Sequence, residues 1–460
     1  MALKAIVYLI IAGIAAVASV CVHPQWGVFG YVATYNINPL SQWWGRDLPE
    51  MVRRYGLIFS TVTLLGYFIH FQKISGHRRI VGSEIWLVML LGAVWLSVWL
   101  GRAGDVTYNV VKTTKFVFMI LLATRILTKR QNFETLILVL IGAAMYLALS
   151  VQWGEGAFHG GRFDRGVGGS DFREGNFLAA HFAFLLPFLG VSLLTGRWRV
   201  KLLCLLAAPW IVNALIITRS RGAFLSILVG ALVTLFQLPR LRSHRKKIFL
   251  LMLVGLIGAF SLTDQDFWER MGSITVERED LDVSAQSRIE AWKAALAMAK
   301  DYPLGVGAGK FLQYVEQYNP LLAGRDTHNT YLRCLAELGV QGLTVLFLLI
   351  ASSFYTLRRV SQTTRQMPER IRSVYDLYQM ASGTALIIYL TAAVFISSVY
   401  IEEFYWFLMF PVFLLKSAEN ELAEQKAMGM ERLSPTTDGM QHGEDGSKEV
   451  TADHGKSFHP

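Results

Sequence analysis

Long apolar runs alternate with short polar connections along most of the chain. Twelve of these runs are long enough to cross a bilayer core, which takes about 17–25 residues in a helix. We therefore predict an all-α polytopic membrane protein with twelve transmembrane helices. The predicted helices cover 3–22, 53–72, 85–101, 106–127, 134–152, 175–195, 202–218, 222–239, 247–264, 335–357, 377–398 and 402–417.

The polar segments divide this pattern into four regions. Residues 1–262 hold the first nine predicted helices and residues 335–418 hold the last three. Between them, 263–334 is a long polar loop, and 419–460 is too poor in apolar residues to fold alone, so we predict a disordered tail. Within the loop, 284–300 has the period of an amphipathic helix. Its predicted apolar face consists of Ile289, Trp292, Leu296 and Ala299.

Positive charge predicts the orientation. The chain is 53% hydrophobic and 17% charged, with a net charge of +10. Its basic residues gather in every second connection, such as Lys73 to Arg79 and Arg240 to Lys247. Because short basic loops stay in the cytoplasm, both termini are predicted to be cytoplasmic and the 263–334 loop to lie outside. Membrane orientation thus explains the basic balance, and we exclude nucleic acid as a partner.

Arg219 and Arg221 lie on the outer side, against this rule, in the turn Thr218-Arg219-Ser220-Arg221-Gly222. An arginine at membrane depth is costly unless it lines a cavity or pairs with an anion. A guanidinium can donate two hydrogen bonds to one phosphate, so the turn favours a site for the phosphate of a lipid carrier. The alternative is that both side chains extend to the lipid head groups.

Two other outer segments carry candidate substrate contacts. The loop 152–174 contains seven glycines together with Arg162, Arg165 and Arg173. Such a loop is expected to bury no core, and to be either mobile surface or a lid over the substrate. Asn176, just inside the next predicted helix, is a polar group that the bilayer would penalise unless it lines a cavity.

His328 lies where the long loop re-enters a helix, in Asp326-Thr327-His328-Asn329-Thr330-Tyr331. A histidine at an interface can titrate near neutral pH and move a proton, which makes His328 a candidate general base. The alternative is an ordinary helix start with Thr327 as the N-cap. Arg288, near the start of the loop helix, could face a ligand or pair with Glu290 or Asp282.

Two acidic pairs are candidate metal sites: Asp264 with Asp266, and Asp280 with Asp282. An Asp-x-Asp pair can hold a divalent cation against a pyrophosphate, but six or more oxygen ligands are usual and are not evident nearby. We predict no metal and no cofactor.

These stretches resemble the signature that O-antigen ligases and O-antigen polymerases share. The residues Arg221-Gly222-Ala223-Phe224-Leu225 are similar to the Arg-x-x-x-Leu motif of the ligases. The Ser287-Arg288 helix, the glycine-rich turn 303–307 and the stretch 328–339 are similar to the rest of the signature. The N-terminal third resembles the O-glycosylation ligases of exosortase systems. One departure is Asp171-Phe172-Arg173-Glu174-Gly175-Asn176, where close relatives have an Asp-Pro-Asn-Asp type.

The resemblance implies a metal-independent, inverting glycosyltransferase of the C-type fold in the bacterial inner membrane. Its donor would be a glycan on undecaprenyl pyrophosphate, and its acceptor a hydroxyl of lipid A-core, with a growing polysaccharide or a protein as alternatives. His328 would be the general base, and Arg221 and Arg288 would neutralise the leaving pyrophosphate. Substrate contacts would come from Arg219, Arg165, Arg173, Asn176, Asn329 and Tyr331. A secondary transporter is the rival class, because twelve helices with both termini inside suit it as well.

Overall fold

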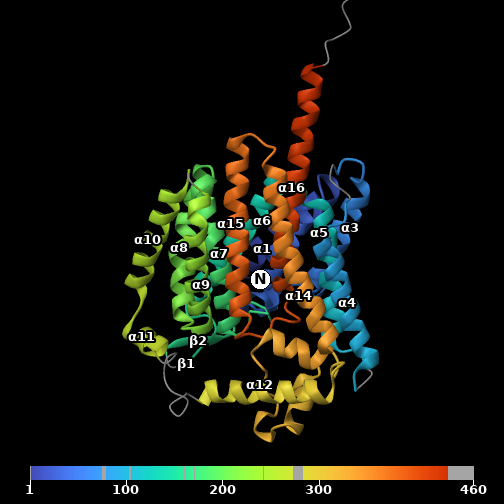
Figure 1. The fold of residues 1–460 in the computed structure, drawn as a ribbon, viewed down its shortest axis with the longest axis vertical. Helices are drawn as coiled ribbons and strands as arrows, with labels where there is room; N and C mark the ends of the chain where they lie inside the picture. The colour runs from blue at the N-terminus through green and yellow to red at the C-terminus, as the bar shows by residue number, and fades with distance from the viewer. Residues whose placement is uncertain are drawn as a thin grey trace, which may run out of the picture. The chain divides into compact units, whose positions relative to one another are not determined.

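The computed structural model describes residues 2–74, 79–102, 105–159, 161–169, 171–172, 174–241, 243–272 and 283–433. Residues 1–422 make one compact unit. In this unit the long helices run side by side, and the connections lie at their two ends (Figure 1). The fold is thus helical, as the apolar runs predict.

A helix forms over each of the twelve predicted runs. These helices are α1 (Leu3–Cys21), α3 (Tyr55–Ile69), α4 (Gly82–Leu100), α5 (Tyr108–Ile126), α6 (Arg130–Gln152), α7 (Gly175–Thr195), α8 (Trp198–Ile217), α9 (Arg221–Gln237), α10 (Arg245–Leu262), α14 (Thr330–Thr364), α15 (Glu369–Ala392) and α16 (Glu402–Leu433). Because helical hydrogen bonds are local, a long apolar run with good helix formers is enough to specify each of them.

Six helices in the described part of the chain are long and apolar enough to cross a membrane: α1, α4, α6, α7, α8 and α14. A seventh crossing results if α10 and α11 (Gln265–Gly272), which meet at 106°, count as one bent span. The other predicted spans are shorter or carry more charge. For example, α5 contains Lys112, Lys115 and Arg125. Twelve crossings therefore stay a prediction, while an all-α membrane protein agrees with the structure.

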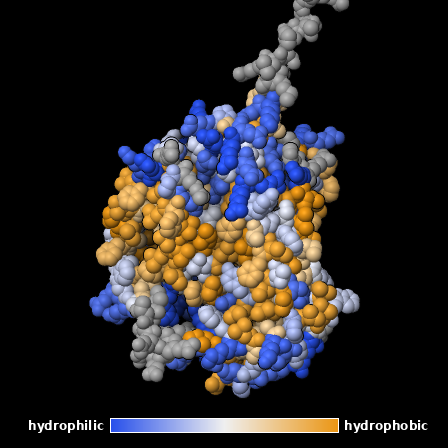
Figure 2. Space-filling view, in the orientation of Figure 1, coloured by the Kyte–Doolittle hydropathy of each residue, from blue (hydrophilic) through white to orange (hydrophobic). Residues whose placement is uncertain are grey.

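The surface of the unit agrees with contact to lipid. In the face shown in Figure 2, a hydrophobic band lies between two hydrophilic ends. Large apolar side chains on α1 and α10 point outward, among them Ile14 at 64% exposure and Leu256 at 66%. Contiguous apolar surface of this kind is unusual on a soluble monomer and marks contact with a membrane or a partner.

One end of the helices carries most of the remaining elements. Near α1, the chain forms α2 (Gln25–Ile37) and three short 3₁₀ turns, Pro39–Ser41, Trp43–Asp47 and Glu50–Arg54. The helices α11 and α12 (Val283–Asp301) lie at the same end of the long helices as β1 and β2. There, α12 crosses beneath the long helices (Figure 1). The short helix α13 (Phe311–Tyr314) follows. The outer segments that were predicted to matter therefore share one end.

The helix predicted over 284–300 is present as α12, but its predicted apolar face is wrong. The buried side chains are Ala291, Ala294, Ala295 and Met298, whereas Leu296 is 53% exposed. The small alanines let α12 lie close to the start of α14 and to the 306–322 segment, with which they form one apolar cluster. Size rather than hydrophobicity decides which face packs, because a close approach of helices requires small side chains.

The loop 152–174 was expected to bury no core, and this expectation is also wrong. Its strands β1 (Ala157–His159) and β2 (Arg162–Arg165) pair antiparallel, with His159 opposite Arg162. Phe163 and Phe172 are completely buried. Two aromatic side chains anchor the glycine-rich segment, since each removes a large apolar area from water.

The last helix is longer than the predicted 402–417. The helix α16 continues to Leu433, past the expected boundary at 419, because 421–433 is rich in Ala, Glu, Met and Leu, which favour helix. Residues 434–460 lie outside the described part.

Candidate active site at one end of the helices

His328 lies directly before α14 in an unusual backbone conformation. Its φ is 47°, a left-handed value that is rare for residues other than glycine. Contacts on both sides of it hold this conformation. Trp292 of α12 donates to the carbonyl oxygen of Thr327 at 2.9 Å, and the Thr330 hydroxyl donates to the carbonyl oxygen of Ile396 at 2.7 Å. Strain of this kind costs about 1–3 kcal/mol and persists only where surrounding contacts over-determine it.

The residues next to His328 are used to build the helix start. The N-cap of α14 is Asn329 and not Thr327, because the Asn329 side chain accepts from the backbone N–H groups of Tyr331 and Leu332, both at 3.0 Å. The Tyr331 hydroxyl donates to the carbonyl oxygen of Leu390 at 2.9 Å. Both predicted substrate residues, Asn329 and Tyr331, thus make internal contacts that position the histidine segment.

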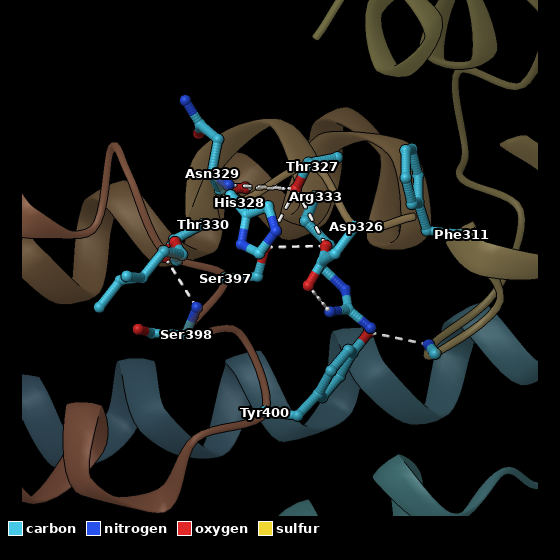
Figure 3. Close-up of polar contacts among 12 residues, drawn as sticks. Phe311, Asp326, Thr327, His328, Asn329, Thr330, Arg333, Ser397, Ser398 and Tyr400 are labelled. Carbon is cyan, nitrogen blue, oxygen red and sulfur yellow. Dashed lines mark hydrogen bonds and ion pairs between the residues drawn. The ribbon is translucent and has the colours of Figure 1, made fainter. Parts of the chain in front are cut away.

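Asp326, two residues before His328, is held by other side chains. Arg333 donates to its carboxylate at 2.8 Å and Ser397 at 2.9 Å (Figure 3). Arg333 also pairs with the fully buried Glu337 at 3.3 Å. Asp326 therefore acts on His328 through its charge and also ties the segment to α14.

Glu337 fixes the glycine-rich turn that follows α12. Its carboxylate accepts from the backbone N–H groups of Gly309 and Phe311, both at 2.9 Å. Two residues later α14 breaks at Gly339, where φ is 71°. A Cβ atom at this position would lie 2.4 Å from the carbonyl carbon of Leu304. Only glycine permits both this φ and this approach, so the break lets the turn dock against α14.

The imidazole of His328 lies in a partly open, charged environment. Its side chain is 28% exposed, and Nδ1 lies 3.9 Å from Oε2 of Glu174. Burial lowers the pKa of His328, and the positive charge of Arg288 lowers the pKa further, while the carboxylates of Asp326 and Glu174 raise it. The net effect of these groups is a lowered pKa, so the ring is neutral at pH 7 and can accept a proton.

Three arginines act on one another through their charges, and one of them, Arg288, also acts on His328. Arg162 of β2 donates to the carbonyl oxygen of Thr218 at 2.9 Å and to the side-chain oxygen of Asn176 at 3.2 Å. Burial lowers the pKa of Arg162, and the positive charges of Arg288 and Arg221 lower it further. Because Arg288 acts on both His328 and Arg162, these four side chains share one electrostatic environment. Like charges brought this close favour the binding of an anion.

Asn176, predicted to contact substrate, has a positioning contact in the structure. Its side-chain oxygen accepts from Arg162 and, at 2.9 Å, from the hydroxyl of Ser220. Ser220 in turn is the N-cap of α9. Asn176 therefore joins β2 to the turn that carries Arg221.

The sequence of this region matches a known family. Residues 202–347 match a protein-family model described as O-antigen ligase. Over these residues, which are less than half of the chain, the protein is similar to O-antigen ligases. No curated protein matches the chain. The similarity supports a glycosyltransferase of the ligase or polymerase type, with a lipid-linked glycan as donor and an acceptor at the membrane.

The matched segment contains Arg221, Arg288 and His328. Arg288 is close enough for its charge to act on both His328 and Arg162, and the charge of Arg221 acts on Arg162. The expected alternative partner of Arg288, Glu290, instead pairs with Lys293 at 2.7 Å. Asp282 lies outside the described residues.

Other predicted residues of the O-antigen ligase site are placed differently. Arg219 pairs with Asp264 at 2.6 Å and with Asp266 at 3.1 Å, so the first acidic pair binds an arginine. Arg165 is exposed and lies 3.8 Å from Asp164. Arg173, Asp280 and Asp282 are not among the residues that the structure describes.

Two residues of the site were missed by sequence reasoning. Arg162 was noticed only as one of several loop arginines, and Glu174 was not singled out. Both precede the segment that matches the O-antigen ligase family. The signal that could have found Glu174 is its place in Asp171 to Asn176, the stretch that departs from the pattern of close relatives.

Proposed function

We propose that the protein transfers a glycan from undecaprenyl pyrophosphate to an acceptor hydroxyl on the periplasmic side of the bacterial inner membrane. The observation that carries this proposal is the convergence of His328 with Arg162, Arg221 and Arg288. They come from four separate parts of the chain, namely the segment before α14, β2, α9 and α12. A neutral base beside several guanidiniums suits the transfer of a group that leaves as an anion.

The reaction is a single displacement. His328 accepts the proton of the acceptor hydroxyl, and the acceptor oxygen forms a bond to the anomeric carbon of the donor sugar. The bond from this carbon to the pyrophosphate oxygen breaks, and its electron pair leaves with the lipid pyrophosphate. Attack from the face opposite the leaving group inverts the anomeric configuration. Arg221 and Arg288 neutralise the charge that develops on the leaving group, and no metal takes part.

The charges around His328 suit a base that becomes positive during the step. Burial, and after it the charge of Arg288, keep the ring neutral before the reaction, since both lower the pKa of His328. The Glu174 carboxylate, 3.9 Å from Nδ1, stabilises the imidazolium once the proton has been taken. At 3.9 Å this contact is an ion pair and not a hydrogen bond, so it stabilises the charge of the ring without fixing which nitrogen takes up the proton.

Lipid A-core is the acceptor that we propose first. A polymerase, which extends a second lipid-linked glycan, is the second candidate. The charge of Arg162 acts together with the charges of Arg221 and Arg288. This extra arginine favours a polymerase, because a polymerase must hold two lipid pyrophosphates. A protein acceptor follows from the likeness to O-glycosylation ligases. The match to the O-antigen ligase family supports a transferase better than it supports a secondary transporter.

Deletion of the gene in its native host, followed by glycan analysis, tests the proposed function. Loss of glycan from lipopolysaccharide indicates a ligase, altered polysaccharide chain length a polymerase, and loss from a protein an O-glycosylation enzyme. An unchanged glycan profile in all three classes would refute the proposal.

Complementation of the deletion tests the residues. We expect His328→Ala to restore no transfer, and Arg221→Lys to restore little, because a lysine lacks the planar fork that grips a phosphate. His244→Ala is the matched control, since the His244 ring hydrogen-bonds to the neighbouring Ser243 hydroxyl and lies between α9 and α10. Immunoblots of membrane fractions verify equal protein levels. Full restoration by His328→Ala would remove the assigned base.

A further inference from the structure

A polar pocket of about 430 Å³ lies beside the catalytic residues. Its walls come from the β1–β2 hairpin, the turn between α8 and α9, and α11, which lie at the same end of the long helices (Figure 1). Three arginines and three acids line it: Arg162, Arg219, Arg270, Asp164, Asp266 and Glu269. This volume falls in the range of sites for small organic ligands.

The composition of the lining narrows the ligand class. No apolar side chain from the described residues lines the pocket, so a lipid chain would gain nothing by entering it. The guanidiniums and carboxylates are equal in number, and Arg219 is paired with Asp266 at 3.1 Å. A pyrophosphate alone would meet repulsion from the acids. An uncharged ligand with many donors and acceptors fits such a lining best.

The walls are held in place without a ligand. Arg270 donates to the carbonyl oxygen of Arg219 at 2.9 Å, and Phe267 and Met271 of α11 are buried against Ile216. Across the pocket, a Cβ atom on Gly161 would lie 3.4 Å from the Arg219 guanidinium, so the hairpin approaches this arginine closely. A pre-formed site loses little conformational entropy on binding.

We propose that this pocket binds uncharged sugar residues of a glycan substrate, beyond the sugar that reacts. A sugar hydroxyl donates to a carboxylate and accepts from a guanidinium at the same time, and the pocket offers both. Arg162 connects the two sites, because it lines the pocket and also faces the charges of Arg221 and Arg288. The proposal rests on the proposed transferase function, and the sugars could belong to the donor or to the acceptor.

Steady-state kinetics of the purified full-length protein test the proposal. The variants are His159→Ala and Glu269→Gln, two exposed residues that line the pocket and do not take part in the chemistry. Glu316→Gln, an exposed glutamate of the same loop region outside the pocket lining, is the control. One set of assays compares a donor carrying the complete glycan with a donor carrying one sugar, and the other set varies the acceptor.

We expect KM for the complete donor to rise about tenfold, as for loss of one hydrogen bond to a charged group, with kcat unchanged. KM for the one-sugar donor should stay the same. A higher KM for the acceptor alone would assign the pocket to acceptor sugars. Equal changes for both donors, or no change in any arm, would overturn the proposal.

A binding measurement separates this proposal from the proposed function. The free glycan released from the donor lipid is titrated into His328→Ala protein with and without Glu269→Gln. Weaker binding in the double variant supports the pocket, and equal binding overturns it, whatever the transfer assay shows. Wild-type transfer by His328→Ala would instead refute the assigned chemistry alone.

Discussion

Glu174→Gln is expected to move the acid limb of the pH–rate profile to lower pH. The Glu174 carboxylate lies 3.9 Å from Nδ1 of His328 and is 49% exposed, so solvent screens the pair. At the dielectric constant of water, the interaction is worth about 1 kcal/mol. The carboxylate raises the pKa of His328, and its removal lets this pKa fall.

The sign of the effect follows from the role of the base. His328 must be neutral to accept a proton, so the rate falls as the pH drops through its pKa. A lower pKa keeps the ring neutral to lower pH, so the acid limb should move to lower pH. The opposite charge change, Arg288→Met, should raise this pKa, but it also removes a contact to the leaving group.

The assay is the initial rate of glycan transfer at saturating donor and acceptor, measured between about pH 5 and pH 8, where histidine titrates. Glu155→Gln is the matched control: it removes the same charge from the same loop, but Glu155 pairs with Lys4 at 3.6 Å. We expect the control to keep the wild-type acid limb. If the acid limb of Glu174→Gln stays in place or moves to higher pH, the carboxylate of Glu174 does not raise the pKa of the base, and the reasoning is refuted.

Two further predictions concern the turn that docks on α14. Glu337→Gln removes a buried charge that pairs with Arg333 and should destabilise the protein by about 3 kcal/mol; an unchanged thermal unfolding midpoint in detergent would contradict this. Gly339→Ala places a Cβ atom 2.4 Å from Leu304 at a φ of 71° and should lower both the melting temperature and the transfer rate. Gly255→Ala, which meets open space, is the control and should change neither.

The sequence by itself determined the helices and marked the position of the candidate histidine along the chain. Each of the twelve apolar runs forms a helix, including 247–264 and 335–357, and the amphipathic period predicted α12 to within one residue at each end. These features depend on hydrogen bonds and side chains only a few residues apart, so a local pattern is sufficient. The stretch 326–331 likewise marked His328 as a loop histidine at the start of a helix.

Only the tertiary structure decided which charged residues meet. Arg219 and Arg221 are equivalent in the sequence, but α11 brings Asp264 and Asp266 to Arg219, while Arg221 acts on Arg162. Glu174 lies more than 150 residues before His328 and reaches it through the packing of the β1–β2 segment. Pairings between distant residues depend on how the helices pack against each other, and no local pattern records that packing.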